Sequence, residues 1–476
     1  MALMPIGAAF RWLAERDPGR PSITIVPTPQ VDVPRRTITR VELELHTNRL
    51  ARTYERLGVK EGDFVTIGLP NSIEFYEACI AAWKLGAIPQ PISYRLPERE
   101  RQEIIELAKP ALVVTSVIDA DPDASDEPLL PDRTAPSLKA PTSGGSTGRP
   151  KIIVAGQPGL CDPEGAGTFG AQPNGTQLVP GPLYHNGPFV FSTGGLFIGQ
   201  HLVVMPRFDA ASALQYIDEF GVDFALFVPT MMTRMLRLPE EERARWSLDS
   251  LRGILHLAAP CPPHVKEAWI DWIGAEKVWE LYAGTEAQGV TIISGPEWLE
   301  HRGTIGRPAE GTMKVTDPDG NEVPRGEVGE IWMKPPGDRP TYRYIGAEAR
   351  ERDGWESLGD MGWMDDDGYL YIADRRTDLI LAGGANIYPA EVEAALEEHP
   401  AMLSCAVIGI PDDDLGQRVH AIVQLSEEVS DDGLRAFLAE RLVQYKIPRS
   451  FERVSEFVRD DAGKVRRSAL VDERSP

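Results

Sequence analysis

Hydrophobic positions along the chain follow two periods. Short apolar runs at Phe64–Leu69, Leu112–Thr115 and Phe224–Pro229 predict buried strands. Between them, apolar residues spaced three and four apart at Ile73–Leu85 and Ala210–Glu219 predict helices. Because strands and helices alternate in this way, the sequence predicts an α/β fold with substantially parallel sheets.

Two apolar segments raise the question of export or membrane insertion. Met1–Phe10 lacks a leading positive charge and a small-residue cleavage site, so it predicts an opening helix near Ile6–Glu15 and no signal peptide. Gly187–Pro206 is almost free of charge, but it holds four glycines and is bounded by Pro188 and Pro206. That composition favours a buried helix followed by a strand over a membrane span.

Two other stretches predict loops. Ile118–Ala140 holds six acidic residues and four prolines and predicts a surface loop. Gly156–Gly175 is rich in glycine and predicts a second loop or a mobile flap.

The C-terminal part of the chain has a different pattern. The charged run 374–378 breaks the alternation, and a helix at Pro389–Glu398, a strand at Ala406–Ile410 and a helix near Leu434–Leu442 follow it. This order predicts a small separate α+β domain. The length of 476 residues agrees, because a single core stops growing at about 250–300 residues.

Composition limits which binding partners and which cellular compartment are expected for the protein. The formal net charge is −23, which speaks against a nucleic-acid backbone as the main partner because phosphates repel such a surface. The four cysteines are widely scattered and make no Cys-x-x-Cys pair, so neither a disulfide framework nor a zinc site is indicated. A reducing, cytoplasmic location fits this pattern.

The segment Thr142–Lys151, Thr-Ser-Gly-Gly-Ser-Thr-Gly-Arg-Pro-Lys, carries the strongest chemical signal. Its glycines let the backbone approach a polyphosphate, its hydroxyl and N–H groups can donate to phosphate oxygens, and Lys151 supplies a point charge. It is not a Walker loop, in which Gly-Lys-Ser/Thr is contiguous. Taken alone, a flexible Ser/Gly linker explains it equally well.

Three further motifs carry groups that a nucleotide could use, although a strand that ends in Tyr with a Glu nearby is common. After the apolar run Val278–Leu281, the sequence Tyr-Ala-Gly-Thr-Glu offers an aromatic face for a purine, a hydroxyl for a phosphate and Glu286 for Mg²⁺. In Leu-Gly-Asp, Asp360 can chelate a ribose diol with help from Arg375. The basic cluster around Lys464 is ordinary surface charge unless the C-terminal domain folds over the nucleotide.

In this order and spacing, the four motifs resemble the adenylate-forming superfamily of acyl-CoA synthetases, luciferases and peptide-synthetase adenylation domains. The resemblance extends from the region Asn71–Pro91 to Lys464 and is nearest to the acyl-CoA ligase branch. It implies a large N-terminal domain of stacked α/β subdomains, residues 1–373, that binds ATP and the acid. It also implies a small mobile α+β C-terminal domain, residues 374–476, that acts as a lid.

The resemblance also implies a role for each matching residue. For ATP binding these residues are Thr142, Ser143, Gly144, Gly145, Ser146, Thr147, Gly148, Lys151, Ala258, Ala259, Pro260, Tyr282, Ala283, Gly284, Asp360 and Arg375. The implied catalytic residues are Lys464, Thr285, Glu286 and His185, with Glu286 as the magnesium ligand. The implied acyl pocket comprises His185, Asn186, Gly187, Ala283, Gly284 and Gly289, the hinge is Thr377, and the thioester-forming face includes Gly383 and Gly384.

The implied activity is that of an ATP-dependent acid–thiol ligase. Such an enzyme forms acyl-AMP, releases pyrophosphate and transfers the acyl group to coenzyme A, with ATP, Mg²⁺ and coenzyme A as cofactors and co-substrates. Two alternatives stay open: loading of the phosphopantetheine thiol of a carrier protein, and a non-catalytic acyl or nucleotide sensor. Amino-acid activation is disfavoured, because Asn186 and Gly187 stand where such domains usually carry an Asp. Neither a nucleic-acid partner nor a membrane span is expected, and a homodimer stays open.

The pocket segments suggest the kind of acid. They are apolar, rich in small residues and without an obvious cation, which favours a bulky, largely apolar acid. The stretch Pro182–Phe189 also resembles that of ligases for polycyclic acids such as bile or steroid-type acids. Fatty and aryl acids remain open alternatives.

Overall fold

The computed structural model describes residues 3–144, 150–335, 337, 339–376, 378–382, 385–412, 415–459 and 463–474. Its largest sheet has eight strands in the order β15-β14-β13-β12-β10-β11-β2-β3, and the strands from β14 to β2 run parallel. The edge strands β15 and β3 are antiparallel to their neighbours. The bounds are β2 Pro21–Ile25, β3 Arg36–Thr39, β10 Thr176–Val179, β11 His201–Val204, β12 Phe224–Phe227, β13 Gly253–His256, β14 Val278–Ala283 and β15 Val290–Ser294.

This sheet is covered on both faces. Along β11, Leu202 and Val204 belong to one hydrophobic cluster and Val203 to another, because successive side chains point to opposite faces. Strands buried on both faces have continuous apolar sequences, as predicted. The flanking helices are α1 Ile6–Arg16, α2 Arg40–Arg56, α3 Ile73–Lys84, α5 Asn186–Phe197, α6 Ala210–Phe220, α7 Pro229–Leu236, α8 Glu240–Arg243, α9 Pro263–Ile273 and α10 Gly295–Glu300, with a 3₁₀ turn at Ala275–Lys277.

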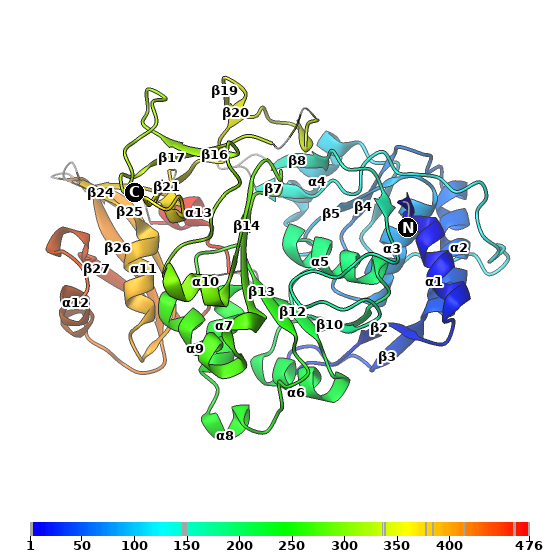
Figure 1. Cartoon of the computed structure of the whole chain (residues 1–476), viewed down its shortest axis with the longest axis horizontal. Helices are drawn as coiled ribbons and strands as arrows, with labels where there is room; N and C mark the ends of the chain where they lie inside the picture. The colour runs from blue at the N-terminus through cyan, green and yellow to red at the C-terminus, as the bar shows by residue number, and fades with distance from the viewer. Residues whose placement is uncertain are drawn as a thin grey trace.

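Two three-stranded sheets lie beside each other on the N-terminal side (Figure 1). The parallel sheet β5-β4-β6 shares a hydrophobic cluster with β8 of the antiparallel sheet β18-β8-β7. The bounds are β4 Phe64–Ile67, β5 Ile88–Pro91, α4 Glu98–Ala108, β6 Leu112–Val114, β7 Thr142–Gly144, β8 Pro150–Ala155 and β18 Tyr342–Ile345, and the short pair β1 Met4–Pro5 with β9 Leu160–Cys161 ties down the N-terminus.

A further sheet, β19-β20-β17-β21-β22 with β16 added, comes before the C-terminal domain in the chain. Its bounds are β16 Met313–Thr316, β17 Gly329–Met333, β19 Glu351–Arg352, β20 Trp355–Glu356, β21 Asp360–Met364 and β22 Leu370–Arg375. The hairpin β21–β22 pairs Asp360 with Arg375 in register.

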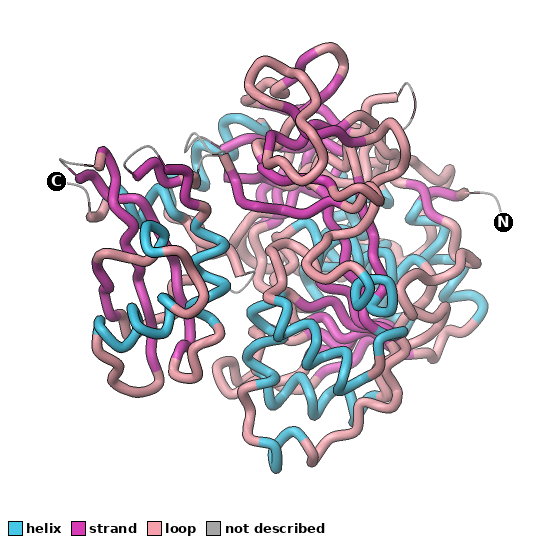
Figure 2. The backbone as a smooth tube through the Cα atoms, turned by 60° about the vertical axis from the view of Figure 1, so that its left-hand side comes forward, coloured by secondary structure: helices cyan, strands magenta, loops and turns pink. Residues whose placement is uncertain are grey.

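The C-terminal elements form a domain with its own core, which Figure 2 shows at one side of the molecule. Its sheet has the order β24-β23-β26-β25, with β27 parallel to β26. The bounds are β23 Ile380–Ala382, β24 Ala385–Ile387, α11 Pro389–Glu397, β25 Met402–Asp412, β26 Gly416–Leu425, α12 Asp431–Ala439, β27 Ser450–Arg453 and α13 Arg467–Asp472, with a 3₁₀ turn at Gln444–Lys446.

The predicted α/β architecture is therefore confirmed, and so is the buried helix and strand within 187–206, which are α5 and β11. In the part of the chain that the structure describes, no helix has the length and apolar character needed to cross a membrane. The loop 118–140 contains no helix or strand, but its end does not lie on the surface. Lys139 and Ala140 are buried, and their backbones are joined to neighbouring strands. Ala155 N–H in β8 donates to Lys139 O, and Ala140 N–H donates to Pro89 O in β5.

Candidate active site

The second and third nucleotide motifs meet at the end of β14. Tyr282, near the carboxyl end of β14, donates its hydroxyl to Asp360 Oδ2 over 2.6 Å, and Asp360 begins β21. The carboxyl ends of parallel strands are where α/β sheets bind ligands, because the loops there open a crevice. An aromatic ring and a buried carboxylate thus stand together at the usual edge for a nucleoside.

A carboxylate, a lysine and a tyrosine lie next to this pair. Glu286 follows β14 and is buried, and its Oε1 accepts a hydrogen bond from the hydroxyl of Tyr344 over 2.6 Å. Lys151 Nζ lies 3.2 Å from the same oxygen and 2.9 Å from the Tyr344 hydroxyl oxygen. Burial, and then the Glu286 charge, raise the pKa of Tyr344, so the phenol stays protonated and continues to donate. The strands β8 and β18, which pair antiparallel, position both partners.

The C-terminal domain brings a positive charge to His185. Burial first, and then the charges of Lys464 and Arg466, lower the pKa of His185 to about 3. The segment that carries them lies against the large domain: a Cβ on Gly463 would be 3.2 Å from Thr230 Oγ1, and Arg466 Nη1 is 3.6 Å from Glu100 Oε1. The segment with the basic cluster therefore contacts the large domain, while Lys464 and Arg466 themselves are exposed, and His185 is a neutral imidazole near pH 7.

One cation of the site was not predicted. Lys139 lies at the end of the acidic loop, and its ammonium group donates to Asn186 Oδ1 at the start of α5. Burial lowers the pKa of Lys139 to about 8, while the charge of Glu286 raises it. The predicted pocket segments themselves contain no lysine or arginine, but Lys139, from a proline-rich loop, reaches them at Asn186.

Close contacts limit the space around the predicted acyl residues. A Cβ on Gly187 would lie 2.9 Å from Leu257 Cδ1, and a Cβ on Gly284 would lie 2.4 Å from Leu358 Cδ1. In the turn after β13, Ala258 has a φ of +78°, a conformation that costs a residue with a Cβ about 1–2 kcal/mol. The surrounding structure therefore holds Ala258 in a left-handed backbone conformation that alanine disfavours.

The remaining predicted residues fall on the same elements. The backbones of Thr142, Ser143 and Gly144 lie in β7, Ala259 and Pro260 follow Ala258, Ala283 ends β14, Thr285 and Gly289 lie between β14 and β15, and Arg375 ends β22. The predicted residues Gly145, Ser146, Thr147, Gly148, Thr377, Gly383 and Gly384 lie outside the described residues.

Tyr344 is the other functional candidate that the sequence analysis missed. Its only signal is the alternation of Tyr342 and Tyr344, which places both rings on one face of a strand. Tyr342 donates to a different carboxylate, Glu356, over 2.6 Å.

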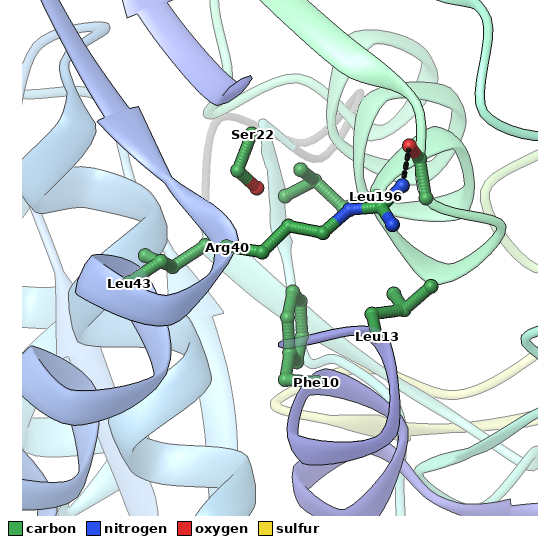
Figure 3. A pocket seen from close by; sticks show the side chains of 7 residues that line it. Phe10, Leu13, Ser22, Arg40, Leu43 and Leu196 are labelled. Carbon is green, nitrogen blue, oxygen red and sulfur yellow. Dashed lines mark hydrogen bonds between the residues drawn. The ribbon is translucent and has the colours of Figure 1, made fainter. Parts of the chain in front are cut away.

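Two small pockets elsewhere are too small for a nucleotide or an acyl chain. One lies between α1, α2 and α5 around Arg40 (Figure 3), and its volume of about 10 Å³ holds about one water. The other, of similar volume, lies beside Lys84. Arg40 donates to Asn174 Oδ1 and Gly199 O, which ties these elements together.

Two family models match the chain. The family model described as AMP-binding enzyme matches residues 10–142 and 140–342, and the model described as AMP-binding enzyme C-terminal domain matches residues 391–464.

Relatives of known activity cover nearly the full length. A long-chain fatty acid–CoA ligase of Mycobacterium tuberculosis is 30% identical, over 97% of this chain and 98% of that protein. A fatty acid–[acyl-carrier-protein] ligase of Streptomyces coeruleorubidus is 28% identical, over 94% and 93%. The structure of o-succinylbenzoate–CoA synthetase from Bacillus subtilis with ATP and magnesium ion superposes with a TM-score of 0.78, at 26% identity, over 98% of this chain and 100% of that one. The chain therefore belongs to the AMP-binding enzyme family.

Proposed function

We propose that the protein is an ATP-dependent acid–thiol ligase that forms acyl-AMP with release of pyrophosphate and then transfers the acyl group to coenzyme A. The observation that carries this proposal is the ion pair of Lys151 with the buried Glu286 just after β14, the strand at whose end Tyr282 and Asp360 meet, together with the contact of the Lys464 segment with the large domain at Thr230. The family match over both domains supports the same activity.

The chemistry explains why these groups are needed. A carboxylate is a poor electrophile, because its oxygens share the charge and neither leaves. Attack of a carboxylate oxygen on the α-phosphorus forms the P–O bond of acyl-AMP and breaks the bond to the leaving pyrophosphate. The transfer requires alignment of two anions and neutralisation of phosphate charge. We assign Lys464 to the substrate carboxylate and α-phosphate, and Lys151 to the outer phosphates.

We assign the nucleoside to Tyr282 and Asp360, and the magnesium ion to Glu286. The part of the chain that the structure describes holds no group of three or more His, Cys, Asp or Glu side chains suited to a metal. A single buried carboxylate is nevertheless what Mg²⁺·ATP needs, because Mg²⁺ is usually held by one or two carboxylates together with phosphate oxygens and waters. When bound, the ion neutralises charge on the phosphates.

We assign His185 to the boundary between the acyl pocket and the path of the thiol. With a pKa of about 3 its imidazole carries no charge at pH 7, so it does not add to the cationic field of the lysines. It contributes shape and hydrogen bonding instead. For the acid we keep the proposal of a bulky, largely apolar substrate, with Lys139 and Asn186 as the polar groups nearest to its pocket.

We further propose that the large domain ends near residue 373 and that the C-terminal domain turns about Thr377 between half-reactions, so that the thioester-forming face at Gly383 and Gly384 replaces Lys464. A thiol attacking the acyl carbon needs a different lining from a carboxylate attacking phosphorus, and domain rotation supplies it. A carrier-protein thiol is the alternative acceptor, which the Streptomyces relative favours.

Pyrophosphate release tests the proposal. The full chain is incubated with ATP, Mg²⁺ and a panel of decanoate, palmitate, benzoate and cholate, with and without coenzyme A. Release with one acid, and acyl-CoA when the thiol is added, is the expected result. Lys464→Ala should abolish adenylate formation and keep thioester formation from supplied acyl-adenylate, whereas equal loss of both contradicts the assigned lysine role. No release with any acid favours a sensor, and AMP without a requirement for coenzyme A favours another acceptor.

A further inference from the structure

Lys464 lies on a segment with an arginine on either side, and both arginines reach the same buried carboxylate. Arg459 Nη2 donates to Glu393 Oε2 over 2.6 Å, and Arg467 Nη2 donates to Glu393 Oε1 over 2.7 Å. Glu393 lies on α11 and is only 4% exposed. One side chain of the helix thus holds the chain before and after Lys464.

The carboxylate of Glu393 is well satisfied. Its Oε1 also accepts the backbone N–H of Val407 on β25 over 2.8 Å, so helix, strand and C-terminal segment meet at one group. The charges of Arg459 and Arg467 hold the pKa of Glu393 below its ordinary value against the effect of burial. Buried charges are tolerated only with such pairing, and removing one partner costs several kcal/mol.

Arg459 also binds the backbone directly before Lys464. Arg459 uses its other nitrogen, Nη1, to donate to the carbonyl of Gly463 over 3.2 Å, and that peptide directly precedes Lys464. Gly463 has a φ of +76°, which suits glycine, and lies against Thr230 of the large domain. Arg459 therefore fixes the backbone that directs the Lys464 side chain, and it does so next to the contact of Gly463 with Thr230 in the large domain.

Arg467 connects the same carboxylate to the start of the C-terminal domain. Its Nη1 donates to Asp378 Oδ2 over 2.8 Å, and its Nε donates to Val407 O over 3.2 Å. Because Asp378 directly follows the proposed hinge, a rotation there carries Glu393 and the segment with Lys464 as one body.

We propose that Glu393 is a positioning residue for Lys464: through Arg459 and Arg467 it holds the segment that presents the lysine to the acyl carboxylate and α-phosphate during adenylate formation. This inference rests on the proposed function. Since the thiol step uses another face of the domain, loss of the carboxylate affects the first half-reaction and spares the second.

Glu393→Gln keeps the size of the side chain and removes its charge. Two buried guanidinium groups then face a neutral amide. Among the described residues, Glu397 lies 3.6 Å from Arg459, Asp378 accepts from Arg467, and the charge of Asp374 also acts on Arg467. Because hydrogen bonds to charged groups are stronger than neutral ones, we expect kcat for pyrophosphate release to fall about 30-fold, which corresponds to about 2 kcal/mol. The KM for ATP should stay within about threefold, because the ATP-binding residues are untouched.

Three variants of the full chain are compared with the unmodified protein. Arg459→Lys keeps a cation for Glu393 but cannot also donate in a fork to Gly463 O, and should show the same selective loss to a smaller extent. Glu452→Gln is the matched control, because Glu452 accepts two hydrogen bonds from Arg474 in the same domain, away from Lys464, and should change neither half-reaction. Thermal unfolding reports whether each variant folds.

Two readouts decide the question. The first is the ratio of pyrophosphate release to thioester formation from supplied acyl-adenylate, which should fall in Glu393→Gln. The second needs no acid: backbone hydrogen exchange of residues 463–467, followed by mass spectrometry, should accelerate at least about tenfold relative to the control. Equal loss of both half-reactions, or unchanged exchange at these amides, overturns the inference. If the unmodified protein releases no pyrophosphate with any acid, the proposed function fails, and hydrogen exchange still decides whether Glu393 holds the segment.

Discussion

The burial of Lys139 predicts how the free energy of unfolding of the protein depends on pH. Its side chain is 7% exposed, and burial lowers its pKa from 10.5 to about 8. A shift of roughly 2.5 pKa units corresponds to about 3 kcal/mol. Because the folded protein binds this proton more weakly than the unfolded chain, the destabilisation is fully present below about pH 8 and disappears as the pH rises towards 10.5.

Lys139→Met removes the ammonium group and keeps most of the apolar stem. The variant loses the hydrogen bond to Asn186, worth about 1 kcal/mol, and gains about 3 kcal/mol by relieving the buried charge. Its free energy of unfolding at pH 7 should therefore exceed that of the unmodified protein by about 2 kcal/mol, and this advantage should vanish near pH 10.

Denaturant unfolding followed by circular dichroism at pH 7 and pH 10 measures both values. Lys60→Met, at an exposed lysine, is the control and should show no such dependence on pH. A Lys139→Met variant that is less stable at pH 7, or whose advantage is equal at the two pH values, would refute the argument from burial.

Three further outcomes follow from single contacts. Tyr344→Phe should raise the Mg²⁺ concentration that half-saturates pyrophosphate release about tenfold, since a hydrogen bond to a charged group contributes about 1.5 kcal/mol, while Tyr342→Phe on the same strand should not; an equal response of both variants contradicts a role at Glu286. Glu286→Gln should weaken the Mg²⁺-dependent first step, and an unchanged magnesium requirement counts against a metal role. Ala258→Gly should raise the free energy of unfolding by about 1 kcal/mol in denaturant titrations, because glycine relieves the positive φ; a less stable variant shows that the turn is not strained.

The regular elements could be predicted because their signals are local. The helix predicted at Ile73–Leu85 is α3, Ile73–Lys84, where Ser72 accepts the N–H of Phe75 as an N-cap. The strand predicted at Phe224–Pro229 is β12, Phe224–Phe227, and the residues beyond it begin α7. Apolar spacing and capping act within a few residues, so the sequence alone contains them.

The site residues that the sequence analysis missed contact residues that lie far away in the chain. Lys139 is 47 residues from Asn186, and Tyr344 is 58 residues from Glu286. Glu393 is 66 residues from Arg459, and no local pattern distinguishes it from the exposed acidic positions of a helix. These contacts arise when sheets and domains pack together, which periodicity does not describe.

These contacts show how an acidic chain can still offer positive charge to anionic substrates. A net charge of −23 opposes the approach of ATP, coenzyme A and a carboxylate, yet exposed charges are screened beyond about 8 Å at physiological ionic strength. Buried or partly buried cations are screened far less, and this applies to Lys139 and to Lys151 beside Glu286. Lys464 is exposed, but its segment lies against Thr230 of the large domain, and its charge lowers the pKa of His185. The local field that the anionic substrates meet is therefore set by a few placed lysines. With Lys151 and Lys464 in the roles that we propose, that field is complete only when the two domains meet, which would tie the charge needed for adenylate formation to one arrangement of the domains.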